Sequence, residues 1–371
     1  YGTSGNVDLR KTRDPIGTIS TDSYTRFPTI IITSLNDPSL RWEKIATVNL
    51  GLDFSFLSRR ISGSLDWYFK KGKDLYGLTD YDYTTWGYQP TITKNVASMQ
   101  GKGVDLVLNS LNLNKTVKWS SRLLLSFNKN KTTKYFNANG NTLLNFLNDG
   151  SGITPMVGYP LNGLGAFKWM GISADGLGQG VLDGNISAEY AKIRSSVALN
   201  PENNESILFV GSSKPQLFGN IINTVSWKNV EMSINISYTG DYYFRKPVTS
   251  YANLYQKGVA YPDFDRRWQQ PGDERYIDVP KMTYPVLSGA DSFFQAADVN
   301  VLKADHLRLE YISLGWNREI MFNNHKSKLM LYLNVSNLGI LWTANKLGID
   351  PEFPYKLAPQ PVYSLGLKID Y

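Results

Sequence analysis

The chain has 371 residues, a formal net charge of +7, 42% hydrophobic residues and no cysteine. Its mean hydropathy of −0.29 is too polar for a helical membrane protein, and no run of eighteen or more apolar residues is present. The missing cysteines exclude disulfides and thiolate metal sites. The lysines and arginines form only short, scattered clusters, a pattern that does not indicate nucleic-acid binding.

Residues 1–44 are rich in Thr, Ser, Asp, Gly and Pro, and they are expected to form an irregular loop region. Alternation of apolar and polar residues then predicts strands over 45–56 and 60–71, followed by a second pair over 100–111 and 116–128. These lengths suit a tilted strand that crosses a bilayer, which needs about 9–11 residues.

The second half of the chain continues the same pattern. The alternation is strictest in 230–242, and it slips around Tyr311 and Ile312 as a β-bulge would make it slip. The five predicted strands are 215–227, 230–242, 302–316, 328–338 and 361–371.

The last strand shows the pattern most plainly. Tyr363, Leu365, Leu367, Ile369 and Tyr371 share one face, and the residues between them are small or polar. A soluble sheet packed on a core also alternates in this way, whereas a membrane barrel turns the apolar row toward lipid and the polar row toward a wet lumen. One strand does not separate these two interpretations.

The connections between the predicted strands favour the membrane barrel. They alternate between short ones and the long loops 72–99, 129–214, 243–301 and 339–361. Long irregular loops are uncommon inside a compact soluble domain, but outer-membrane barrels combine short periplasmic turns with long extracellular loops. The predicted fold class is therefore all-β: a transmembrane antiparallel β-barrel occupying residues 45–371, with about nine strands, in preference to a soluble sandwich.

The same alternation predicts the orientation in a bacterial outer membrane. The carboxy terminus is expected in the periplasm, the long loops outside the cell, and residues 1–44 at the extracellular side. Complete bacterial barrels have an even number of strands and begin in the periplasm. We therefore expect this chain to be the carboxy-terminal part of a larger barrel, or one piece of a cleaved protein.

The sequence offers little for catalysis or for binding a metal. His306 and His325, the only histidines, are not spaced as metal ligands, and no Gly-x-Ser-x-Gly motif occurs. The glycine-rich run 171–180 lacks the lysine and the strand-to-helix context of a phosphate-binding loop. The chain is not expected to be an enzyme, and no cofactor or metal is predicted.

Two groups of residues are candidates for a transport or binding site. Polar residues on the inward face of predicted strands are expected to line a wet lumen, and aromatic residues of the long loops are expected to form a ligand or partner surface. Packing of the loops on one another is the alternative for any single ring. The lumen candidates are Lys118, Arg122, Glu231 and Asn235, and the loop aromatics are Tyr83, Trp86, Tyr88, Trp169, Tyr255 and Trp268.

Nine short stretches, in order along the chain, resemble the SusC/RagA-type TonB-dependent outer-membrane transporters. They are YGTSGN (1–6), DPSLRWE (37–43), GSLDWY (63–68), MQGKGVDL (99–106), GSSKP (211–215) before FG (218–219), RWQQPGD (267–273), LRLEYISLG (307–315), NL (337–338) before GIDPE (348–352), and the aromatic-terminated last strand.

The resemblance implies a 22-stranded barrel with a plug domain and a TonB-contacting segment upstream of this chain. It also implies a SusD-type surface lipoprotein as a lid that the loop aromatics would meet, and import of oligosaccharides or peptides. Two alternatives stay open: a transporter-like barrel acting as a scaffold in a larger outer-membrane assembly or adhesion complex, and an outer-membrane barrel hydrolase.

Overall fold

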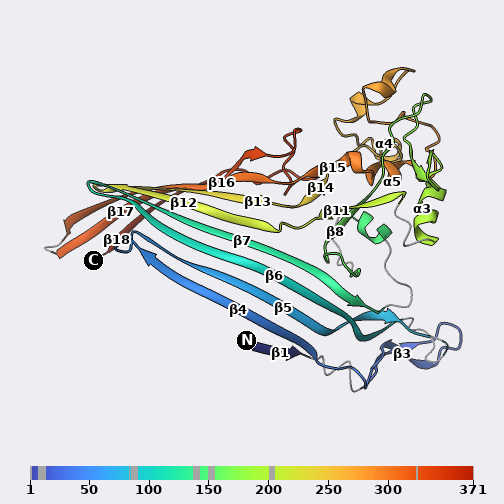
Figure 1. Ribbon diagram of the computed structural model, residues 1–371, viewed down its shortest axis with the longest axis horizontal. Helices are drawn as coiled ribbons and strands as arrows, with labels where there is room; N and C mark the ends of the chain where they lie inside the picture. The colour runs from blue at the N-terminus through green and yellow to red at the C-terminus, as the bar shows by residue number, and fades with distance from the viewer. Residues whose placement is uncertain are drawn as a thin grey trace.

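The computed structural model of the chain is dominated by one long, curved antiparallel sheet, shown in Figure 1. The structure describes residues 2–6, 14–82, 84, 91–136, 143–148, 155–199, 205–322 and 325–370. Ten of the described strands make up the sheet, in the order β1-β4-β5-β6-β7-β12-β13-β16-β17-β18. Apart from β1, they follow the chain, so each strand pairs with the sheet strands before and after it.

Nine of these strands correspond to the nine predicted from the sequence. They are β4 (Glu43–Phe56), β5 (Ile61–Asp80), β6 (Thr91–Asn114), β7 (Val117–Tyr135), β12 (Leu217–Trp227), β13 (Val230–Gly240), β16 (His306–Phe322), β17 (His325–Thr343) and β18 (Val362–Asp370). The all-β fold class is confirmed, and the sheet is an open portion of a barrel wall with β1 and β18 at its edges.

The region 1–44 is not wholly irregular, and this prediction was wrong in part. β1 (Gly2–Asn6) pairs with the start of β4, and β2 (Ile16–Thr21) pairs with β3 (Pro28–Ser34) in a separate hairpin. Asp22 stabilises the hairpin turn, because its carboxylate accepts hydrogen bonds from the backbone N–H groups of Tyr24 and Thr25. Both features escape a search for alternation because the strands are short and rich in Gly, Thr and Ser.

The connections lie at the two ends of the strands (Figure 1). The short ones all lie at one end, which we call the edge with short connections, and the long ones lie at the other, which we call the edge with long connections. The long ones differ from the predicted bounds: β5 continues to Asp80 and β6 begins at Thr91, so the connection predicted over 72–99 is much shorter. Strands β7 and β17 likewise run past the predicted loop starts at 129 and 339. The extra residues of β7, from Lys129 to Lys134, are polar on both faces, which hides them from a pattern based on alternation.

A β-bulge interrupts β16 where the sequence predicted one. Asn235 pairs with Tyr311 and Ile236 pairs with Leu309, so Glu310 is the extra residue. The Glu310 carboxylate accepts a hydrogen bond from the Ser237 hydroxyl on β13. The slip in apolar phase near Tyr311 is thereby explained.

The register collects the apolar residues on one face of the sheet. Directly paired residues of an antiparallel sheet share a face, and the pairs run from Leu52 to Leu65, then to Leu106 and Leu125. Across the other half, Leu314 of β16 pairs with Leu333, which pairs with Leu365 of β18. We call this continuous surface the apolar belt. Many of its side chains are exposed in the isolated chain, as expected for a surface that meets lipid.

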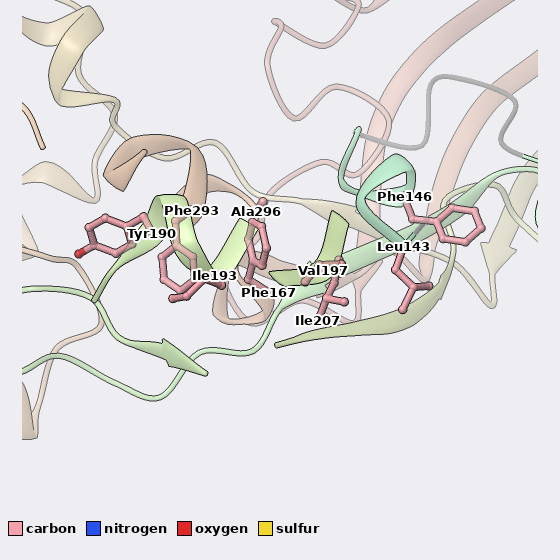
Figure 2. Close-up of a cluster of buried hydrophobic side chains, with 9 residues drawn as sticks. All are labelled: Leu143, Phe146, Phe167, Tyr190, Ile193, Val197, Ile207, Phe293 and Ala296. Carbon is pink, nitrogen blue, oxygen red and sulfur yellow. The ribbon is translucent and has the colours of Figure 1, made fainter. Parts of the chain in front are cut away.

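The long connections fold into a compact layer at one end of the sheet, which we call the loop layer. Its core joins the 3₁₀ helix η1 (Leu143–Leu147), strands β8 (Gly163–Phe167) and β11 (Ile207–Ser212), and helices α3 (Tyr190–Leu199) and α5 (Ala290–Gln295). Phe167 and Phe293 stack in this core with ring centroids 5.3 Å apart, and both are labelled in Figure 2. These connections therefore have a hydrophobic core of their own.

The other described elements of the loop layer are short. They are β9 (Gly180–Leu182), β10 (Asn185–Ser187), β14 (Tyr243–Arg245), α4 (Tyr251–Lys257), η2 (Phe264–Arg266), η3 (Asp273–Arg275), η4 (Asp298–Asn300) and β15 (Val301–Lys303). Among the residues described, none of the helices has the length and apolar character that a membrane crossing requires.

Candidate functional site

The four lumen candidates lie on one face of the sheet, opposite the apolar belt. Lys118 and Glu231 both pair with Ser226, and the Ser226 hydroxyl donates a hydrogen bond of 2.9 Å to the Glu231 carboxylate. Arg122 and Asn235 both pair with Ile222, two rows nearer the loop layer. This polar face is the surface that a barrel would turn inward.

An ion-pair network lies on the polar face at the start of β16, next to the loop layer. The Arg308 guanidinium of β16 donates to both oxygens of Asp350, at 2.9 and 2.8 Å, and it lies 2.9 Å from a carboxylate oxygen of Glu352. The Arg308 side chain is only 9% exposed, so the two carboxylates compensate a charge that is largely removed from water. Asn345 shapes the turn that presents Asp350, because its amide exchanges hydrogen bonds with the backbone of Ile349.

His306 extends this network and is 1% exposed. Its Nδ1 is 2.9 Å from the Ala304 carbonyl oxygen and 3.5 Å from the Tyr242 hydroxyl, and its Nε2 is 3.8 Å from Glu352. Burial raises the pKa of the Tyr242 phenol, and the nearby carboxylates raise it further. The arrangement contains no nucleophile activated by a base, and it joins strand β16 to the connection that precedes β18.

Arg245, at the end of β14, holds three long connections together. Its buried guanidinium donates hydrogen bonds to the carbonyl oxygens of Leu147, Gly165 and Ala296. Its own carbonyl oxygen accepts a bond from the Tyr355 hydroxyl at 3.4 Å. Because a buried guanidinium needs several acceptors, this residue fixes the relative positions of segments that are far apart in sequence.

A cavity of about 370 Å³ opens beside Arg245. Lys246 and Lys257 line it together with hydroxyl and amide groups, among them Ser250 and Asn253, and its lining includes no carboxylate. Burial lowers the pKa of the Lys246 ammonium, and the Arg266 guanidinium lowers it further. The cavity therefore combines hydrogen-bond donors with positive charge at the base of the loop layer.

The described loop aromatics occupy different surroundings. Trp169 packs against Phe293 and Phe294 in the loop-layer core, and the Trp268 indole donates to Glu274. Tyr255 stacks edge-on against Tyr284, which is 82% exposed. Tyr83, Trp86 and Tyr88 lie outside the described residues. Tyr255 and Tyr284 thus form the exposed aromatic pair of the described loop layer, and Tyr284 was missed from the sequence.

The sequence also missed the partnership of Arg308 with Asp350 and Glu352. Both partners lay within stretches singled out for their resemblance to transporters, LRLEYISLG and GIDPE, but no local pattern links positions 42 residues apart. No group of three or more His, Asp or Glu suited to hold a metal occurs in the part of the chain that the structure describes.

The fold matches a solved transporter over the whole chain. The structure of the RagAB peptide transporter superposes with a TM-score of 0.76 and 21% sequence identity, covering 100% of this chain and 40% of that one. At this identity the match concerns the fold alone.

Sequence comparisons point the same way, although no family profile matches the chain. The TonB-dependent receptor P26 of Formosa agariphila is 26% identical over 95% of this chain and 36% of its own length. The TonB-dependent receptor SusC of Bacteroides thetaiotaomicron is 34% identical over 26% of this chain and 10% of its own. The chain therefore spans about a third of the length of the receptor P26.

The sheet, with its apolar belt, polar face and two unlike edges, defines a portion of an outer-membrane β-barrel. Within that class the chain is similar to part of the SusC/RagA-type TonB-dependent transporters, as its resemblances predicted. The relatives carry the names of receptors and transporters, and neither the fold nor these names point to an enzyme.

Proposed function

We propose that the complete protein imports oligosaccharides or peptides across the outer membrane, with energy delivered through TonB. The observation that carries the proposal is the division of one sheet into an apolar belt and a polar face, closed at one edge by a folded loop layer. Lys118, Arg122, Glu231 and Asn235 would then line the wet interior. The carboxy terminus and the short connections would face the periplasm.

The loop layer is the part of the protein proposed to meet the ligand and a SusD-type lipoprotein lid. The name of RagAB and the SusC relative motivate this partner. Tyr255 and Tyr284 offer an exposed aromatic pair that suits the apolar face of a sugar ring or a peptide side chain. The cavity beside Lys246 supplies donors for carbonyl, hydroxyl or carboxylate groups of the same ligand.

Affinity purification of the full-length protein from outer membranes tests the partner. A transporter is expected to bring down one surface lipoprotein in a stoichiometric amount, and its ligand uptake should disappear in a strain without TonB. Recovery of many structural or adhesive proteins, with uptake that does not require TonB, would instead support the scaffold alternative.

The aromatic pair allows a more local test of the ligand surface. Tyr255→Ala together with Tyr284→Ala should weaken ligand uptake about tenfold, in keeping with the contribution of stacked aromatic rings. Tyr24→Ala is a matched control, since that ring is 95% exposed on the separate β2–β3 hairpin. Equal uptake by the double variant and the control would contradict a role for the pair.

A further inference from the structure

Lysines gather on the outward face of the sheet, just beyond the apolar belt at the edge with long connections. Phe69 of the belt pairs with Lys102, which pairs with Lys129. In the next row, Lys71 pairs with Gln100, which pairs with Lys131. The alternation of the strands places these lysines on the same face as Trp67, Val104 and Phe127. We call Lys71, Lys102, Lys129 and Lys131 the lysine cluster.

The lysine cluster is a local concentration of uncompensated charge. Lys102 and Lys129 lie directly opposite each other on neighbouring strands, where like charges destabilise a sheet. No hydrogen bond or ion pair joins any of the four ammonium groups to a carboxylate among the described residues. Arg41, which precedes β4, does have such a partner, Asp74, at 2.8 Å. An external anion would resolve the repulsion.

A cavity of about 380 Å³ lies between these side chains and the loop layer. Lys102, Lys129 and Lys131 line it on one side, and Gly158 and Pro160 of the connection after β7 line it on the other. Phe69 contributes an aromatic ring at the border with the apolar belt. The cavity therefore places lysine side chains next to an aromatic ring of the apolar belt, and an amphiphile requires such a combination of charged and apolar surface.

We propose that the lysine cluster binds the phosphate groups of a lipid headgroup, whose acyl chains lie along the apolar belt. This inference rests on the proposed function, because it requires the edge with long connections to sit at the outer leaflet of the membrane. Lysine is a phosphate binder that acts as a point charge, and basic residues near an anionic membrane surface each add to the attraction. The lysine stems extend the apolar surface toward the belt.

Lipid binding to the full-length protein in neutral detergent tests the proposal, with diphosphoryl lipid A as the probe and its dephosphorylated form as the ligand control. Lys102→Gln with Lys129→Gln should weaken binding of the phosphorylated form roughly 25-fold, at about fivefold for each lysine. Lys115→Gln with Lys228→Gln removes the same charge at the edge with short connections, and it should leave binding unchanged. The double Lys102/Lys129 variant should still co-purify with the lid lipoprotein, so that this inference and the proposed function can fail separately.

The sign of a stability change provides a second, independent readout. In neutral detergent, Lys129→Gln relieves the repulsion between Lys102 and Lys129 and should raise the unfolding temperature. In bilayers containing the phosphorylated lipid, the same substitution removes a phosphate contact and should lower the unfolding temperature. An unchanged sign would overturn the proposal, as would equal affinity of the double variant and the parent. Displacement of bound lipid A by millimolar inorganic phosphate alone, with dephosphorylated lipid bound equally well, would also overturn it, because the site would then hold free phosphate.

Discussion

At the scale of single residues, Arg308 is the group whose surroundings most restrict substitution. It is buried on the polar face, and two carboxylates from the connection before β18 compensate its charge. Removing one member of such a pair leaves an uncompensated buried charge, which costs far more than losing an exposed pair.

Arg308→Ala is therefore expected to lower the free energy of unfolding by roughly 3 kcal/mol. Arg41→Ala is the matched control, because that arginine is 65% exposed and pairs with Asp74, and its loss should cost about 0–1 kcal/mol. Urea titration of the refolded protein in vesicles measures both values. Equal effects would show that the Arg308 network contributes little to stability.

A second residue-scale constraint lies at Gly366, on the polar face of β18. Tyr332 pairs with Gly366 across the strands, and its ring occupies the space that a side chain at position 366 would need. Gly366→Ala should therefore destabilise the barrel by about 1–3 kcal/mol through overpacking.

The double variant Gly366→Ala with Tyr332→Ala provides the control for this effect. Removing the ring opens the space, so the cost of the alanine at 366 should largely disappear in the double-variant background. The comparison can be made from the fraction of heat-resistant, compact protein on a gel. A cost that is the same with and without the ring would contradict the contact.

At the scale of elements, β13 separates the two faces most clearly. Val230, Met232 and Ile234 share the face of the apolar belt, while Glu231 and Asn235 share the polar face. A cation at the centre of a lipid-facing strand is costly, whereas one that points into a wet lumen is not.

Ile234→Arg is accordingly expected to cost about 2–4 kcal/mol, whereas Asn235→Arg should be nearly neutral. Folding yield into lipid vesicles and urea titration of the folded fraction measure the difference. The two positions are adjacent in one strand and receive the same side chain, so each controls for the other. Similar losses at both positions would refute the assignment of the faces.

The loop layer is a second element-scale feature, because Arg245 holds its segments together. Arg245→Leu should loosen the connections that its guanidinium bonds, through the loss of contacts to Leu147, Gly165 and Ala296. We expect protease cleavage within residues 136–216 to accelerate at least tenfold while the strands stay protected. Unchanged cleavage would show that the hydrophobic core alone maintains the layer.

The elements also show what a sequence can predict without its structure. The nine long strands and the bulge near Tyr311 follow from local alternation, which one strand carries by itself. The pairing of β1 with β4, and of Arg308 with Asp350, depends on the register between distant segments, and no local pattern records it. The core of the loop layer was missed for the same reason, since Leu143, Phe167 and Phe293 meet only after two connections have folded together.

The loop aromatics show the same limit within the candidate site. Composition singled out Trp169, Trp268 and Tyr255 alike, because aromatic residues serve both packing and recognition. Their surroundings differ only in three dimensions: Trp169 packs in the core, whereas Tyr255 reaches the exposed Tyr284. For the lumen candidates, strand alternation alone places Lys118, Arg122 and their neighbours on one face, and their position in a lumen stays a prediction.

At the scale of the whole molecule, the solvent that each face of the sheet meets distinguishes a membrane-spanning wall from a soluble sheet. The apolar belt crosses β4 to β18 without interruption, and the polar face lies behind it. In a soluble protein the belt would need a second layer to cover it, and the described residues form no such layer. Membrane lipid supplies that cover in a barrel.

The absence of cysteine from the chain makes this claim directly measurable by spin labelling at single introduced cysteines. In the protein reconstituted into bilayers, labels at Leu333, Leu365 and Leu367 should collide with oxygen, which partitions into hydrocarbon. Labels at Asn334, Ser364 and Lys368 should collide with a water-soluble nickel complex, so that accessibility alternates with a period of two along β17 and β18. Equal exposure of both sets to the nickel complex, or shielding of both sets from both reagents, would contradict a membrane-spanning wall.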